Sequence, residues 1–256
     1  MLCRDGVIES VDDSTTSSVD CEIDARNLLV FPGFIDPHVH SRDPGLTHKE
    51  DFEHSTRAAA AGGITTLFEM PNAIPPVANA AIFEQRAEQH ARVAFVDFGL
   101  WGIALGQENL GDLADLFRAG VVGVKLFWGY ALHRETRMLV YNLADESPDK
   151  LVPPPSNGDV LEICRAVASV DGLVGAHCED RAVIEAAESR LGRPIASYSE
   201  MLEIRSDTAE AVAIAVGAEL SATSGCRFHV VHTASARGIR VVRRAQADGV
   251  RLSAET

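Results

Sequence analysis

The stretch from Gly33 to Met70 reads GFIDPHVHSRDPGLTHKEDFEHSTRAAAAGGITTLFEM, and its pattern decides the predicted fold. A short apolar run, Phe34–His40, is followed by a helical stretch, Glu50–Ala61, and then by a second apolar run, Ile64–Met70. Short strands that alternate with helices are typical of βα units, whose strands pair in parallel. The stretch therefore predicts an α/β fold with a parallel sheet.

The same alternation continues to the end of the chain, with apolar residues at three- and four-residue spacing in the helical stretches. The predicted strands are Phe34–His40, Ile64–Met70, Ala94–Ile103, Val121–Phe127, Leu173–Cys178, Phe228–His232 and Val250–Ala254. The predicted helices are Glu50–Ala61, Ala80–Ala91, Leu110–Ala119, Gly158–Val170, Asp180–Leu191 and Asp207–Ala222. A (β/α)8 TIM-type barrel needs eight strands. The seventh ends near Thr256, so we expect a barrel that is truncated before strand 8, or one whose eighth strand comes from elsewhere.

Two segments depart from this rhythm. Residues 1–31 are acidic and rich in Ser and Thr, with strand-like pieces at Val7–Val11 and Leu28–Phe31. His133–Asp159 contains three consecutive prolines, which fit neither a helix interior nor a central strand. We expect a long loop there, after the fourth strand, on the face where such barrels carry their active sites. A lid, a subunit contact and a passive surface insertion all remain open for it.

Composition excludes several classes of protein. The chain has 256 residues and a formal net charge of −14, and a nucleic-acid partner requires clustered Lys and Arg instead. It has no apolar run long enough to span a membrane and no signal-peptide pattern at its start. The five cysteines form no CxxC pair, as expected of reduced thiols, and the predicted location is cytoplasmic.

Histidines close three of the predicted strands. His38 and His40 are two residues apart on one strand, so their side chains point to the same side. His177 and His232 end the fifth and sixth strands. Each histidine alone has a plain reading as an ordinary strand-end residue, but together they predict a metal site at the carboxyl end of the barrel. His229 lies an odd number of residues from His232, so we expect it to face away from this site.

Lys125 lies in an apolar strand, Val121–Phe127. A lysine there either extends its amine to solvent or has a partner, because burying its charge is costly. Burial lowers the pKa of a lysine, and its neutral amine is a nucleophile. Such an amine can take up carbon dioxide to form an anionic carbamate able to bridge two metals.

The segments PGFIDPHVHSRDPGLTHKEDF, AAAAGGITTLFEMPN, GVKLF, GAHCED and HVVHTAS, in this order, resemble the signature of the cyclic amidohydrolases. This group of the amidohydrolase superfamily contains dihydroorotases, allantoinases and hydantoinases. The resemblance spans Phe31–Thr256. It implies that residues 1–31 are part of a small β-sandwich and that residues 32–256 form a metal-dependent hydrolase barrel, incomplete at its C-terminal end.

The resemblance also implies a binuclear zinc site. His38 and His40 would hold one zinc ion, His177 and His232 the other, and carboxylated Lys125 would bridge them. A hydroxide between the metals would attack the amide carbonyl and open the ring C–N bond. The family's general base is an aspartate that closes the eighth strand, which this sequence does not reach.

The resemblance implies a small cyclic amide as substrate. Arg42 and Asn72 resemble the pair that grips the substrate carboxylate in dihydroorotases, which a guanidinium suits well. Tyr130 lies where hydantoinases have a tyrosine that hydrogen-bonds the reacting carbonyl. A dihydroorotase-like activity is therefore the first expectation, with allantoinase or hydantoinase/dihydropyrimidinase as alternatives and a non-catalytic homologue as an alternative of another class. The family also implies a homo-oligomer, either a dimer or a tetramer.

Overall fold

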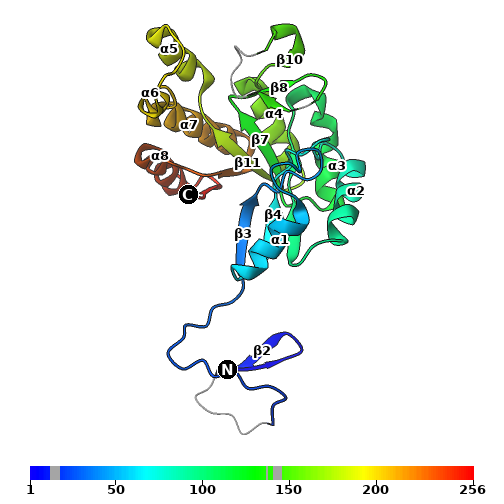
Figure 1. Cartoon of the computed structure of the whole chain (residues 1–256). Coiled ribbons are helices and arrows are strands. Elements are labelled where there is room, and N and C mark those ends of the chain that lie inside the picture. The colour runs from blue at the N-terminus through cyan, green and yellow to red at the C-terminus, as the bar shows by residue number, and fades with distance from the viewer. Residues whose placement is uncertain (12–17, 137, 141–145) are drawn as a thin grey trace. The chain divides into compact units, whose positions relative to one another are not determined.

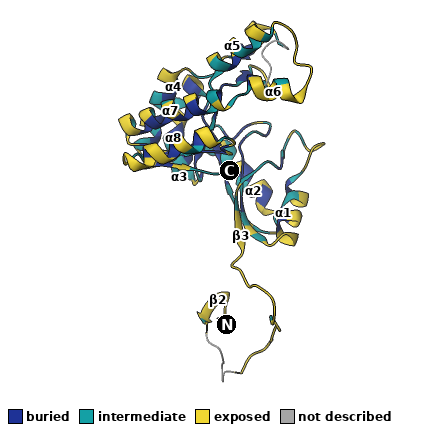
Figure 2. Ribbon diagram, turned by 90° about the vertical axis from the view of Figure 1, so that its left-hand side faces the viewer, coloured by how far each residue is buried: buried dark blue, intermediate teal, exposed yellow. Residues whose placement is uncertain are grey.

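The computed structural model describes residues 1–11, 18–136, 138–140 and 146–256, and the chain divides into two compact units, Met1–Pro32 and Gly33–Thr256. The first unit contains an antiparallel hairpin of β1 (Leu2–Arg4) and β2 (Val7–Ser10). Most of its described residues are exposed (Figure 2). The strand predicted at Leu28–Phe31 is wrong, since these residues form no strand in the structure and their side chains are exposed.

The second unit is built on parallel strands (Figure 1). They form two sheets, in the orders β3-β4-β5 and β6-β7-β11-β12-β13. Their bounds are β3 Phe34–Val39, β4 Ile64–Glu69, β5 Asp97–Leu100, β6 Gly102–Ile103, β7 Val124–Trp128, β11 Leu173–Cys178, β12 Arg227–Val230 and β13 Leu252–Ala254. Each of the seven predicted strands therefore overlaps a strand of the structure. Among the described residues, β3 and β13 are each paired along one edge.

Trp101 joins the two sheets. It is the single residue between β5 and β6, so the predicted third strand changes partners there. Its backbone N–H donates to the Glu69 carbonyl at 2.9 Å, and the next N–H, that of Gly102, donates to the Gly123 carbonyl at 2.9 Å. The indole is 3% exposed and donates to the Pro37 carbonyl at 3.1 Å. One continuous run of parallel strands from β3 to β13 results.

Helices cover the outside of these strands, and neighbouring helices α2, α3, α4, α7 and α8 pack side by side. Their bounds are α1 Phe52–Ala61, α2 Ala80–Ala91, α3 Leu113–Ala119, α4 Asn157–Ala168, α5 Arg181–Leu191, α6 Tyr198–Ile204, α7 Asp207–Ser224 and α8 Ala236–Ala247. Asn79 caps α2 as its position predicts, and Ser156 and Asp159 form a capping box at the start of α4. The helices α6 and α8 fall outside the predicted helical ranges. None of the described helices is both long and apolar enough to cross a membrane.

The predicted loop after the fourth strand carries structure of its own. A small antiparallel sheet in the order β10-β8-β9 runs into it, with β8 (Ala131–His133) at its start and β9 (Leu139–Val140) and β10 (Leu151–Val152) inside it. Residues 137 and 141–145 of this loop lie outside the described residues. The three prolines follow β10 and lead into α4, as their missing N–H groups require.

The Trp101 indole fills the interior of the barrel beneath Lys125 and His177. A Cβ added to Gly175, two residues before His177 and on the same side of β11, would lie 2.7 Å from Trp101 Cζ3. Only a glycine leaves room for the ring at this position.

We expect Gly175→Ala to lower the free energy of unfolding by about 1–3 kcal/mol, because the added methyl group overpacks the barrel interior. Gly111→Ala is the matched control, since a Cβ at Gly111 meets nothing within 4 Å. Urea unfolding of both variants measures the difference. Equal midpoints would show that the indole moves aside at little cost.

Candidate metal centre

His38 and His40 come together at the end of β3. Their Nε2 atoms are 3.2 Å apart, and their ring centroids are 5.1 Å apart. The outer nitrogen of each ring has an oxygen partner: His40 Nδ1 donates to Asn72 Oδ1 at 2.7 Å, and His38 Nδ1 contacts the Glu255 carboxylate. Strand alternation thus brings the pair to one side, as the sequence predicts.

A second pair lies at the ends of β11 and β12. His177 Nδ1 and His232 Nε2 are 3.1 Å apart. The other nitrogen of His177, Nε2, donates to Glu179 at 2.6 Å. The two pairs are neighbours, because the His38 and His232 rings lie 5.4 Å apart.

The outer partners fix where the ring protons lie. A carboxylate or an amide oxygen can only accept, so the outer nitrogen of His38, His40 and His177 carries the proton. The inner nitrogen then presents a lone pair. In the first pair, two lone pairs face each other at 3.2 Å, which is no hydrogen bond between neutral rings. A cation shared by the two nitrogens fits this arrangement.

The spacing also fits a metal. Zinc–nitrogen bonds of about 2.0–2.1 Å in tetrahedral geometry place two ligand atoms roughly 3.3 Å apart. Burial, followed by the charge of Arg42, lowers the pKa of His40 to about 3. Burial, followed by the charge of His177, lowers the pKa of His232 to about 4. Both rings are therefore neutral at neutral pH, as metal ligation requires.

Lys125 lies among these histidines. It is 1% exposed, on β7, and its charge contributes to lowering the pKa values of His40, His177 and His232. Burial lowers the pKa of Lys125 itself to about 7, although Cys178 and Glu255 act to raise it. A large fraction of this amine is therefore unprotonated at neutral pH. The structure brings together all five residues predicted as metal ligands.

Two acidic residues that are not among the predicted site residues lie in this centre, although the position of Glu179 after His177 is compatible with capping the next helix or with orienting the imidazole. Glu255 lies just after β13 and contacts His38, and Glu179 lies just after β11 and bonds His177. Asp180, the neighbour of Glu179, caps α5 and accepts from Val183 N at 2.9 Å. The signal available for Glu179 is its place two residues after a strand-end histidine. Burial alone would raise the pKa of Glu179, but hydrogen bonds from His177 and Arg205 lower it to about 2.

The expected orientation of His229 is wrong. Its Nε2 lies 3.3 Å from Glu255, on the same side as the metal-site residues. The prediction assumed that the strand continues to His232. In the structure β12 ends at Val230, and His232 has a φ of +40°, so the alternation stops before it. His229 therefore faces the barrel interior.

Arg42 and Asn72, the predicted carboxylate grip, lie on two adjoining loops. Arg42 has a φ of +67°, and the backbone N–H of the preceding Ser41 donates to both oxygens of Glu69 at 3.0 Å. Arg86, 3% exposed on α2, donates to the carbonyls of Pro75 at 2.8 Å and Asp43 at 3.3 Å, and so ties the loops together. Among the described residues, the guanidinium of Arg42 makes no hydrogen bond or ion pair.

Tyr130 lies beside the second histidine pair. Its ring centroid is 4.7 Å from that of His177, and its hydroxyl donates to Glu179 at 3.2 Å and contacts Arg205. Burial, followed by the charge of Glu179, raises the pKa of Tyr130 to about 12. The hydroxyl therefore remains a donor throughout the neutral range. A cavity of about 380 Å³ adjoins this group, with His177, His232, Glu179 and Arg205 in its lining.

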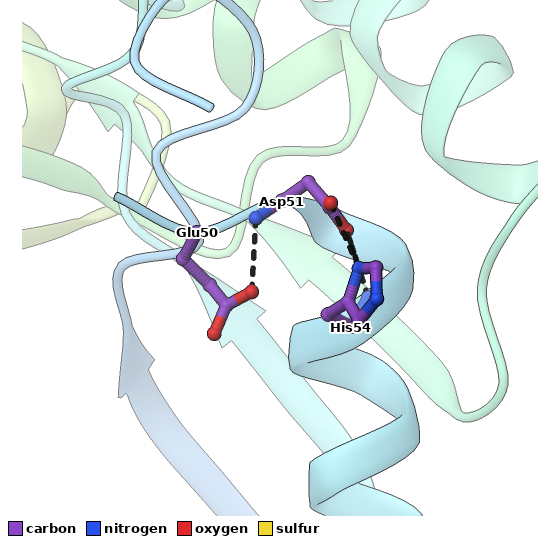
Figure 3. Close-up of side chains that lie close together, drawn as sticks. All are labelled: Glu50, Asp51 and His54. Carbon is purple, nitrogen blue, oxygen red and sulfur yellow. Dashed lines mark hydrogen bonds and ion pairs between the residues drawn. The ribbon is translucent and has the colours of Figure 1, made fainter. Parts of the chain in front are cut away.

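An exposed group at the start of α1 also gathers ligand-type atoms (Figure 3). Asp51 caps the helix by accepting from His54 N at 2.8 Å, and the His54 ring bonds the same carboxylate at 2.8 Å. Glu50 accepts from the backbone N–H of Asp51 at 3.0 Å. These contacts make a helix cap, which explains the arrangement fully. None of the predicted metal ligands belongs to it.

Parallel strands with convergent histidines at their carboxyl ends define a TIM-barrel type α/β protein. A profile of the Amidohydrolase family matches residues 29–254, and the chain belongs to this family. The resemblance inferred from the motifs is confirmed. The family is metal-dependent, in agreement with the donor set.

Curated relatives carry two different names. The chain is 36% identical over 237 residues to an allantoinase of Streptomyces avermitilis, covering 91% of this chain and 48% of the relative. It is 31% identical over 258 residues to a dihydroorotase of Listeria monocytogenes, covering all of this chain and 55% of the relative. A solved L-hydantoinase (dihydropyrimidinase) of Arthrobacter aurescens has a TM-score of 0.80 and 28% identity, covering 94% of this chain and 51% of that one. The chain spans about half the length of the relatives it matches.

We expect the unfolding free energy of the wild type to rise with pH relative to that of Lys125→Met. In metal-free protein without bicarbonate, the wild type carries a lysine whose pKa is lowered from 10.5 to about 7. Between these values the unfolded chain binds more protons, so wild-type stability rises with pH relative to the variant. Urea unfolding between about pH 7 and 10 measures this. Lys49→Met removes an exposed lysine and is the control. A constant difference across this range would contradict the burial of a titrating amine.

Proposed function

We propose that this chain forms the barrel of a hydrolase that opens the C–N bond of a cyclic amide or ureide, with two zinc ions held at the mouth. One observation carries this proposal. Two pairs of imidazole nitrogens, 3.2 Å and 3.1 Å apart, converge around a buried lysine, and acceptor-only partners direct three of their four lone pairs inward.

In this proposal His38 and His40 would hold the first zinc ion, and His177 and His232 would hold the second. Lys125 would be carboxylated and would serve both metal positions. Its neutral Nζ attacks carbon dioxide, an N–C bond forms and one proton leaves, which gives an anionic carbamate. Its pKa of about 7 supports this step, because the amine that reacts is the unprotonated one.

Two bound zinc ions would supply an activated water and polarise the substrate carbonyl. The chain's own residues hold and orient the ring. Arg42 would pair with a substrate carboxylate through its guanidinium, and Asn72 would help to hold the same group while its Oδ1 fixes the tautomer of His40. Tyr130 would donate to the reacting carbonyl, which requires its hydroxyl to leave Glu179.

Dihydroorotate is the substrate we place first, because the guanidinium of Arg42 lies close to His40 and suits a carboxylate. The names of the relatives make allantoin and hydantoin or dihydropyrimidine rings the alternatives. We further propose that an eighth strand with the general-base aspartate completes the sheet between β13 and β3. A β-sandwich that includes residues 1–31, a homo-oligomer and a cytoplasmic location complete the proposal; all five cysteines are free thiols, as in a reducing compartment.

The first experiment measures metal content and intact mass. We expect about two zinc ions per chain after loading with zinc and bicarbonate, and a mass gain of one carbon dioxide that acid removes. Lys125→Met should lose both, while Lys49→Met should keep both. A wild-type chain that binds no zinc under these conditions would contradict the metal centre and favour a non-catalytic homologue.

The second experiment tests the substrate class. We expect Arg42→Gln to lower kcat/KM for dihydroorotate about 100-fold or more, because a charge-assisted pair with the substrate carboxylate is lost. The same variant should leave hydantoin, which has no carboxylate, nearly unchanged. An equal loss on both rings would mean that Arg42 acts on the site as a whole and would remove the argument for a carboxylate substrate.

A further inference from the structure

Glu255 connects three strands of the metal centre. One of its oxygens, Oε1, contacts His38 Nδ1 and also accepts the backbone N–H of His232 at 3.2 Å. The other oxygen, Oε2, lies 3.3 Å from His229 Nε2. The carboxylate follows β13, whereas its partners belong to β3 and to the β12 end. No other described carboxylate bonds an imidazole of the first pair.

His229 and Ser253 form a chain of hydrogen-bond contacts that leads to this carboxylate. His229 Nδ1 lies 2.9 Å from Ser253 Oγ, so the ring bridges Ser253 and Glu255. The strand register places Lys125, Gly175, His229 and Ser253 in one lateral row across β7, β11, β12 and β13. Gly175 has no side chain, which leaves that part of the row to its neighbours and to Trp101. His229 therefore belongs to the same interior layer as Lys125.

Glu255 acts as a hydrogen-bond acceptor in this setting. Its Oε1 accepts the backbone N–H of His232, and the same oxygen contacts His38 Nδ1. A carboxylate oxygen that already accepts an N–H bond can accept the Nδ1 proton of His38 as well. It thus keeps the proton of His38 on Nδ1 and the lone pair on Nε2, which faces His40.

We propose that Glu255, supported by His229, is a positioning residue that sets the affinity of the first metal position, the one held by His38 and His40. The inference rests on the proposed zinc site and goes beyond it, since it assigns separate control to each ion. The second position has its own carboxylate: Glu179 bonds His177 and is held by Arg205, whose Nε donates to Glu179 Oε1 at 3.0 Å. Carboxylates behind metal-bound histidines commonly change metal affinity by about 10–100-fold.

The test compares Glu255→Met with Glu179→Met and separates the two positions. His232→Ala leaves the first pair as the zinc site, and His40→Ala leaves the second pair. We expect Glu255→Met to weaken zinc binding about 10–100-fold in the His232→Ala background. The loss should be far smaller in the His40→Ala background, where Glu255 meets the remaining pair only through the backbone N–H of His232. Glu179→Met should show the reverse pattern. Competition with a chromophoric chelator measures these affinities without any turnover.

A second measurement excludes a merely structural role. In metal-free protein, the ¹⁵N shifts of the His38 ring should report a proton on Nδ1 in the wild type and on Nε2 in Glu255→Met. Glu255→Gln should restore part of the affinity, because its amide oxygen still accepts from Nδ1. Equal weakening at both positions, or an unchanged His38 tautomer, would overturn the proposal. A wild type that binds no zinc would instead refute the metal site itself, so the two failures are distinguishable.

Discussion

Inward-facing lone pairs on the imidazole rings are the constraint on which the rest of the site depends. The outer hydrogen bonds of His38, His40 and His177 leave a lone pair on the inner nitrogen of each ring, and in the first pair two of these nitrogens lie 3.2 Å apart. The acceptors in those bonds, Asn72, Glu179 and Glu255, follow β4, β11 and β13. The carboxyl ends of several strands must therefore lie close together. The parallel order of the sheet achieves this, because the carboxyl ends of all its strands meet at one edge.

Two ionisable side chains, Lys125 and Glu69, are buried, and burial shifts the pKa of each toward its neutral form. Lys125 has no direct salt bridge among the described ion pairs, and its pKa falls. Glu69 is 3% exposed, and burial raises its pKa to about 7 even though the Ser41 backbone donates to it. Arg86 lies nearby and holds the carbonyls of two loops. The loop that presents Arg42 is thus built on buried polar contacts, which are costly to leave unpaired.

Much of the fold could be predicted from the sequence. The alternation of short apolar runs with helical stretches predicted the strands. The predicted range Leu173–Cys178 agrees with β11 at both ends, because turn residues on either side of a buried apolar run define where the strand begins and ends. The spacing of His38 and His40 indicated one side of one strand. His229 was misplaced because a left-handed residue at His232 breaks the alternation, and no local signal marks that turn. Glu255 could not be found because its partner His38 lies 217 residues away, and only the curvature of the sheet brings the ends of β13 and β3 together. Leu28–Phe31 has the composition of a strand, but composition does not determine whether a neighbouring strand is in place to pair with it.

The glycines around Trp101 have a consequence for how such a sequence can change over generations. The indole occupies the interior that side chains at Gly123 and Gly175 would otherwise need. A lineage that replaces the tryptophan with a smaller residue leaves a void, and one that first enlarges either glycine creates a clash. Each single step is disfavoured while the combined exchange is not. The three positions are therefore expected to vary as a set, so homologues should show either the bulky ring with two glycines or a smaller residue with larger side chains opposite it.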